Sequence, residues 1–389
     1  MKKIAWLCLP VLFLVVVLSG CSKDHAPTTF SYTVPTTYNF TNFNDSNQLK
    51  LLAMADQIGA KINLANTVPH TVVSAQTLKD MFNNVNNNFL DTALKLNSSG
   101  LKLADYCSPA AKTDILGYFD SVGIFSQSTA AASSGVAGVS ASSASPNKKY
   151  LLSPAGIFYS QVFKKAVNGG ICAYAIADMY LKDSVSNSVD NTTVVAGSGT
   201  AMEHHWDGAF GLFGVPVTFP ATTTGSRYLG SYTNQVDPGL GCNATMMNAF
   251  LKGRAAISGK DLGTKQQQAD IIIKTMDQVN AAAIVQEMKE TDANIEAGDA
   301  VAAYGTLSET LGFIRNFKYY TAPATRVITD AQITQLLALL DSANPANPNL
   351  YLFVNASVNT KAQIEAKTDA IRQLIGKVYG FTAAQLAAQ

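Results

Sequence analysis

The chain has 389 residues, with 28 lysine and arginine side chains against 27 aspartate and glutamate side chains. A balance this close to neutral provides no basic surface for nucleic acid, so the composition argues against a nucleic-acid partner. The length suffices for two domains or one long helical array. Cys107, Cys172 and Cys242 lie far apart, which excludes a disulfide framework and allows one disulfide with one free thiol.

Residues 1–20 have the pattern of a secretory signal, in which a basic pair precedes an apolar stretch. The following Leu18-Ser19-Gly20-Cys21 matches the lipobox of bacterial lipoproteins. That resemblance implies cleavage before Cys21, lipidation of its thiol and amine, and a membrane partner held through the acyl chains. Ser22, where aspartate would retain a lipoprotein at the inner membrane, favours the outer membrane, on its periplasmic or cell-surface face.

The segment 21–44 is polar and lacks helical periodicity, so we expect a flexible tether. Docking of its aromatic side chains on the folded body of the protein is the alternative. From residue 45 to 389 the signals are helical. The first helices are expected over 45–64, 74–96 and 110–125. Residues 126–147 are rich in serine and alanine and carry no charge. Such a stretch buries too little side chain to become ordered, so we predict a disordered insertion.

Ser153-Pro154 is a typical helix start, and this helix is expected to continue past Gly169-Gly170. The run YLFVNASV, residues 351–358, is the best strand candidate and is isolated. We therefore predict an all-α fold of antiparallel bundles. Further helices are expected over residues 243–257, 270–297, 299–319, 329–340 and 360–379.

The stretch AMEHHWDGAFGLFG, residues 201–214, holds two of the four histidines in the chain. On a helix, Met202, Trp206, Phe210 and Phe213 fall on one face, which is the usual pattern of a core-facing stripe. Gly214 is a typical helix end. The two histidines lie outside this stripe and share the helix with two carboxylates.

The run from His205 to Gly214, together with residues 228–240 and 246–257, resembles a family of uncharacterised bacterial lipoproteins that are distantly similar to imelysin-like proteins. The resemblance is densest over residues 150–320. It implies two helical bundles and a His-x-x-Glu pair near their interface that serves as a metal or ligand site. In the related lipoproteins this pair would be His205 and the residue three positions later. Here that residue is Gly208, so the carboxylate is missing.

His204 and Asp207 restore the same three-residue spacing one position earlier, which places both side chains on one side of a helix. A divalent metal or iron is the candidate cofactor. The hypothesised metal ligands are His204, His205 and Asp207. The wider candidate ligand-binding set is Glu203, His204, His205, Asp207, Lys252 and Arg254.

A purely structural interpretation explains the same residues. Glycines at 208, 211 and 214 allow another helix to approach closely, and the carboxylates form a solvated face. Arg254 is more readily explained by a salt bridge to Asp207 across a helix contact than by a ligand.

Three functions remain open at this point. The first is a binding protein of the cell envelope, anchored at the outer membrane and serving metal or iron-compound acquisition. The second is a metal-dependent hydrolase or peptidase that uses the 203–207 cluster, with Glu203 or Asp207 as base. The third is a structural or interaction lipoprotein without a small ligand. No complete catalytic constellation is visible, so no catalytic residue is assigned.

Overall fold

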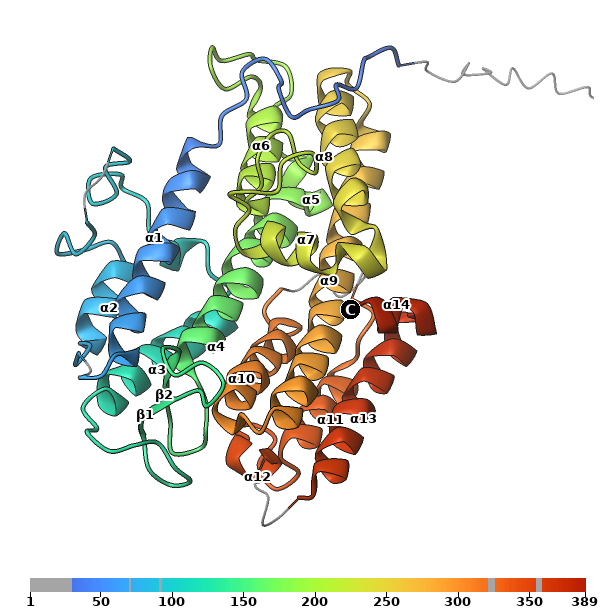
Figure 1. The fold of residues 1–389 in the computed structure, drawn as a ribbon. Coiled ribbons are helices and arrows are strands. Elements are labelled where there is room, and N and C mark those ends of the chain that lie inside the picture. Colours follow the sequence, from blue (N-terminus) through green and yellow to red (C-terminus); the bar gives the residue numbers. More distant parts are fainter. Residues whose placement is uncertain (1–29, 70, 91–92, 321–325, 355–358) are drawn as a thin grey trace, which may run out of the picture. The chain divides into compact units, whose positions relative to one another are not determined.

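Helices dominate the computed structural model, which describes residues 30–69, 71–90, 93–320, 326–354 and 359–389 (Figure 1). The predicted signal, the lipobox and Cys21 lie outside the described residues. Within these ranges every helix is too short or too polar to span a lipid bilayer. The predicted all-α class is confirmed, and the sheet found among the described residues has only two strands.

The first helices begin where their capping residues predict. Ser74 accepts a hydrogen bond from Thr77 N at the start of α2, and Ser108 does the same at the start of α3. The predicted helix over 74–96 is wrong beyond Phe82, because Asn84 and two further asparagines adopt left-handed backbone angles that end it. The elements are α1 (Ser46–Asn63), η1 (Leu64–Asn66), α2 (Ala75–Phe82), η2 (Leu103–Asp105) and α3 (Pro109–Phe125).

A β-hairpin occupies part of the region predicted to be disordered. Strand β1 (Gly138–Ala141) pairs antiparallel with β2 (Lys149–Leu152), and Gly138 lies opposite Leu152. The prediction of a structureless insertion over 126–147 is therefore wrong for β1. A hydrogen bond from a serine helps to hold this hairpin on the rest of the fold, because Ser142 Oγ donates to Asp299 Oδ2 at 2.5 Å.

The next helix begins later than Ser153-Pro154 predicts. Ser153 Oγ instead accepts from Ile157 N in a turn, and α4 begins at Tyr159 (Tyr159–Ala166). The helix then continues with π-helical geometry past Gly169-Gly170, as expected in extent. A Cβ atom on Gly169 would lie 2.2 Å from Asn316, so a larger residue there would clash with α10. These segments are η3 (Val167–Ala173), η4 (Ala175–Leu181) and the short α5 (Asp183–Ser186).

The remaining elements are all helical. The strand candidate is wrong over residues 351–354, which lie in helix α12, and residues 228–240 form helix α7 although their glycine, proline, asparagine and aspartate content is typical of turns. In both places packing against neighbours overrides local propensity. The helices are α6 (Ala201–Phe213), α7 (Tyr228–Leu240), α8 (Cys242–Ser258), α9 (Leu262–Glu296), α10 (Ala300–Asn316), α11 (Asp330–Leu340), α12 (Leu350–Val354), α13 (Lys361–Tyr379) and α14 (Ala383–Ala388).

Helix α9 organises the packing. Its 35 residues span about 52 Å at 1.5 Å per residue, and α8, α10 and α13 all pack along it (Figure 1). Residues Tyr32–Gln389 form one compact unit around a shared hydrophobic core. The division into two bundles and the likeness to imelysin stay predictions. Cys107, Cys172 and Cys242 are buried within this unit as free thiols.

Candidate functional site

Helix α6 forms over the residues predicted. At its start, Thr200 and Glu203 make a capping box, in which each side chain bonds the other residue's backbone N–H. At its end, Gly214 adopts a φ of 74°, which is the left-handed cap that glycine favours. The predicted stripe that includes Trp206 and Phe210 is buried, and Trp206 Nε1 donates to Phe250 O of α8 at 3.0 Å. This packing presents the polar side of α6 to the same neighbour.

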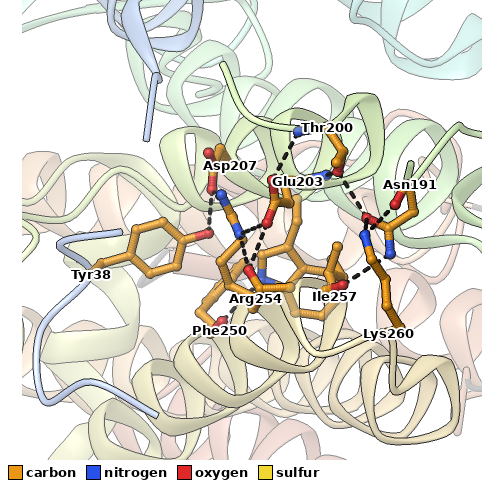
Figure 2. Close-up of polar contacts among 11 residues, drawn as sticks. Tyr38, Asn191, Thr200, Glu203, Asp207, Phe250, Arg254, Ile257 and Lys260 are labelled. Carbon is orange, nitrogen blue, oxygen red and sulfur yellow. Dashed lines mark hydrogen bonds and ion pairs between the residues drawn. The ribbon is translucent and has the colours of Figure 1, made fainter. Parts of the chain in front are cut away.

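Arg254 of α8 joins the two acidic side chains of α6 (Figure 2). Its Nε lies 2.9 Å from Asp207 Oδ1, and its Nη1 lies 2.7 Å from Glu203 Oε1. Asp207 is 0 % and Arg254 1 % exposed. The expected salt bridge across a helix contact is thus present, and Glu203, Asp207 and Arg254 are brought together.

Tyr38 completes this cluster from the N-terminal segment. Its hydroxyl donates to Asp207 Oδ1 at 2.9 Å, and its ring stacks on Phe210 with 3.7 Å between centroids. Arg254 also lies over the ring of Phe40, 5.1 Å from its centroid. Tyr38 is fully buried. The prediction of a flexible tether up to residue 44 is therefore wrong around Tyr38 and Phe40. The aromatic side chains of this segment dock on the body of the protein, which was the alternative that the sequence left open.

A ring of hydrogen bonds extends the cluster toward the end of α8 (Figure 2). Ser258 Oγ donates to Glu203 Oε1 at 2.6 Å. Thr200 Oγ1 donates to Asn191 Oδ1 at 2.9 Å, and Asn191 Nδ2 donates to Ile257 O at 2.9 Å. These hydrogen bonds, together with the ion pairs of Arg254, hold the start of α6 against the C-terminal end of α8.

The three acidic groups of the cluster differ in their electrostatics. Burial raises the pKa of Asp207 to about 6, although the charge of Arg254 and the hydrogen bond from Tyr38 oppose it. For Glu203, burial acts upward, but hydrogen bonds from Ser258 and Thr200 and the charge of Arg254 outweigh it, so its pKa is lowered. Burial, followed by the charge of Asp207, raises the pKa of the Tyr38 hydroxyl well above its usual value.

The two histidines lie apart from this cluster. His204 and His205 are half-buried, and the ring of His205 meets the ring of Tyr180 edge-on at 5.2 Å. Burial, then the neighbouring His204, lowers the pKa of His205, which keeps its imidazole neutral at pH 7. Neither Nδ1 atom has a hydrogen-bond partner among the described residues.

The packing around Gly208 leaves no room for the carboxylate that the resemblance implies at this position. A Cβ atom there would lie 2.9 Å from the Tyr180 ring and 3.1 Å from Gln48 Nε2. At Gly211 it would lie 2.7 Å from Gln48 Cβ, so α1 packs directly on this face of α6. The interpretation that these glycines admit another helix is confirmed at positions 208 and 211.

The candidate residues thus separate into two groups. Glu203, Asp207 and Arg254 converge, whereas His204 and His205 do not join them, and Lys252 is exposed on α8. In the described part of the chain, no three histidine, cysteine, aspartate or glutamate side chains are grouped so that they could hold a metal ion. Metal binding by His204, His205 and Asp207 stays a prediction.

Sequence reasoning did not assign Tyr38 to the site. It lies 169 residues from Asp207, so no spacing rule links the two. The only available signal was the concentration of aromatic residues in a segment otherwise typical of a tether.

Comparison with known proteins places the docked segment inside a family domain. No curated protein and no solved structure matches the chain. A family model described as "Domain of unknown function (DUF4856)" matches residues 35–382, a range that includes Tyr38 as well as α6 and α8. The chain therefore belongs to the DUF4856 family, whose model covers residues 35–382.

Proposed function

We propose that this chain is a binding protein of the bacterial cell envelope, held at the outer membrane by a lipid on Cys21. The observation that carries the proposal is the immobilised N-terminal segment. Tyr38 is buried against α6, and the hydroxyl of Tyr32 donates to Asp261 Oδ2 at 2.9 Å. Tyr32 lies eleven positions after Cys21, and this connection reaches about 40 Å at most when extended.

The Arg254 cluster, which consists of Tyr38, Glu203, Asp207 and Arg254, positions the N-terminal segment in this proposal. Asp207 and Arg254 are buried by the surrounding protein, so they do not form an open ligand site, although Asp207 Oδ2 and Arg254 Nη2 have no hydrogen-bond partner among the described residues. Their contacts with Tyr38 and Phe40 instead hold the N-terminal segment on α6 and α8. A short connection to a docked segment would keep these helices near the membrane surface.

Lipidation is tested by metabolic labelling with a palmitate analogue, followed by membrane fractionation. We expect labelled protein in the outer membrane for the wild type and no label for Cys21→Ala. Ser22→Asp should keep the label but move the protein to the inner membrane, which separates anchoring from sorting. Label on Cys21→Ala, or none on the wild type, would exclude the lipid anchor.

A metal or iron compound is the ligand class that the sequence suggests for α6. In support, the imidazole of His205 is held neutral, which is the form that binds metals. Asp207, however, already accepts hydrogen bonds from Arg254 and Tyr38. Plasma mass spectrometry of the purified chain and of His204→Ala/His205→Ala, after incubation with iron, zinc and copper salts, tests this part. Equal metal content in both proteins would remove the histidines from the proposal.

A further inference from the structure

We propose that a cavity between α1, α4 and the start of α7 binds a small organic molecule through an oxyanion group, either a carboxylate or a phosphate. The cavity has a volume of about 520 Å³, within the range of small-molecule sites. It lies apart from the Arg254 cluster. The inference rests on the binding part of the proposed function, for which it names a ligand class, and is independent of the lipid anchor.

Two cationic side chains supply the charge. Arg227 and Lys164 both line the cavity. Lys164 has no ion pair among the described residues, and its ammonium lies 5.5 Å from the centroid of the Tyr232 ring. Arg227 is paired with Asp56, with 3.3 Å between Nη1 and Oδ2, and both side chains are more than two-fifths exposed. Among the side chains that line the cavity, two cations therefore face one carboxylate, while Glu309 and Glu287 act on Lys164 without lining the cavity.

Backbone and hydroxyl groups converge on the same place. The first turn of α7 begins at Tyr228, and its preceding residue, Arg227, makes no side-chain cap. An uncapped helix start presents free N–H groups and the positive end of the helix dipole to an anion. Ser226 Oγ, which also lines the cavity, is buried without a hydrogen-bond partner in the described part of the chain. A hydroxyl left without a partner in a cationic cavity is suited to donate to an oxyanion.

Aromatic side chains form another part of the wall. Phe158 and Phe163 line the cavity and are 5 % and 1 % exposed within the fold. The volume is far larger than an inorganic ion requires, so the remaining space suits an organic body that contacts these rings. A lining that combines cationic side chains with aromatic rings favours an amphiphilic anion over a bare one.

A second cavity shows that this charge is specific to the first. The cavity of about 390 Å³ beside β2 and α10 is lined by Glu290, Asp299 and Glu309, with Lys148 as its cation. Its carboxylates outnumber its cations, so an anion would be repelled there. The cavity at the start of α7 is the better place for an oxyanion.

Isothermal titration calorimetry on the intact mature protein in a non-ionic detergent tests the assignment. The probes are phenyl phosphate and benzoate, with benzamide as the neutral analogue of the same shape. We expect saturable binding of at least one anion below about 5 mM and none of benzamide. The anion that binds more tightly distinguishes phosphate from carboxylate as the recognised group.

Variants of the lining residues then locate the binding. Lys164→Gln and Arg227→Gln should each weaken binding about tenfold, since each removes a charge-assisted contact. Asp56→Asn should strengthen it, because it removes the carboxylate that competes for Arg227; a merely structural role would not produce this opposite sign. Lys274→Gln, on the exposed face of α9, removes a charge elsewhere and should leave affinity unchanged.

Circular dichroism confirms that each variant is folded, and Arg227→Lys provides a milder change if Arg227→Gln is not. Absence of binding for both anions overturns the proposal, as does equal binding by the wild type, Lys164→Gln and Arg227→Gln. Labelling of Cys21 and metal content are read independently, so a negative titration would leave the anchor and the metal hypothesis to their own tests.

Discussion

At the scale of single residues, Arg254 determines how the acidic side of α6 can be buried. A carboxylate removed from water is costly unless it is paired and hydrogen-bonded. Arg254 donates to Asp207 from its Nε and to Glu203 from its Nη1, and the planar guanidinium holds these two nitrogens in a fixed geometry that the single nitrogen of a lysine does not provide. Removing one member of such a buried group leaves the others uncompensated, and typically costs about 3–5 kcal/mol.

Asp207 should make the stability of the protein depend on pH in a defined direction. Its pKa in the fold is about 6, and in the unfolded chain about 4. Between these values the folded protein holds a proton that the unfolded chain has lost, so rising pH lowers the free energy of unfolding. From about pH 4 to pH 6 we expect the wild type to lose about 2 kcal/mol relative to Asp207→Asn, measured by urea unfolding.

Asp330→Asn is the matched control, because it removes a carboxylate whose side chain is 78 % exposed. A constant difference in unfolding free energy between the wild type and Asp207→Asn over this range would contradict the raised pKa.

At the scale of elements, the glycine face of α6 is a packing surface. Gly208→Glu would create a His-x-x-Glu spacing with His205, but the new side chain meets Tyr180 and Gln48. We expect this variant, and to a smaller extent Gly208→Ala, to be destabilised by about 1–3 kcal/mol through overpacking. Thermal and urea unfolding measure the change.

Gly117→Ala in α3 provides the comparison. Its Cβ would meet nothing within 4 Å, so the substitution should stabilise the protein by about 0.5–1 kcal/mol. If Gly208→Glu were as stable as the wild type and acquired metal, the face would be a vacated ligand site and not a packing surface.

Elements with explicit boundary signals could be predicted from the sequence. Helix α13 begins after the capping box of Thr360 and Gln363 and ends before Gly380, within a residue or two of expectation. Predictions failed where local preference and context conflict. Asn84 adopts a left-handed φ of 48°, which asparagine tolerates but does not require. Helix α7 continues through Pro238, although proline and glycine disfavour a helix.

The contacts of the site were harder to predict where the residues that make them lie farther apart in the sequence. The Arg254–Asp207 pair joins two helices whose faces could each be drawn from periodicity. Tyr38 could not be placed, because its position depends on how the N-terminal segment crosses α6, which no local rule determines.

At the scale of the whole molecule, the N-terminal segment behaves as part of the core. We compare soluble chains that begin at residue 30 and at residue 45. The shorter chain lacks Tyr38, so Asp207 loses a donor and Phe210 loses its stacking partner. We expect it to be less stable by at least about 3 kcal/mol in urea unfolding. Equal stability would restore the prediction of a flexible tether to residue 44.

The buried free thiols bear on the export that we propose. Burial raises the pKa of Cys107 and Cys242 to about 12 and that of Cys172 higher still, so the folded chain holds them as unreactive thiols. An oxidising compartment can therefore attack them only while the chain is open. Folding therefore protects these cysteines from forming wrong disulfides. The rate at which an alkylating reagent modifies them measures how often the native core opens.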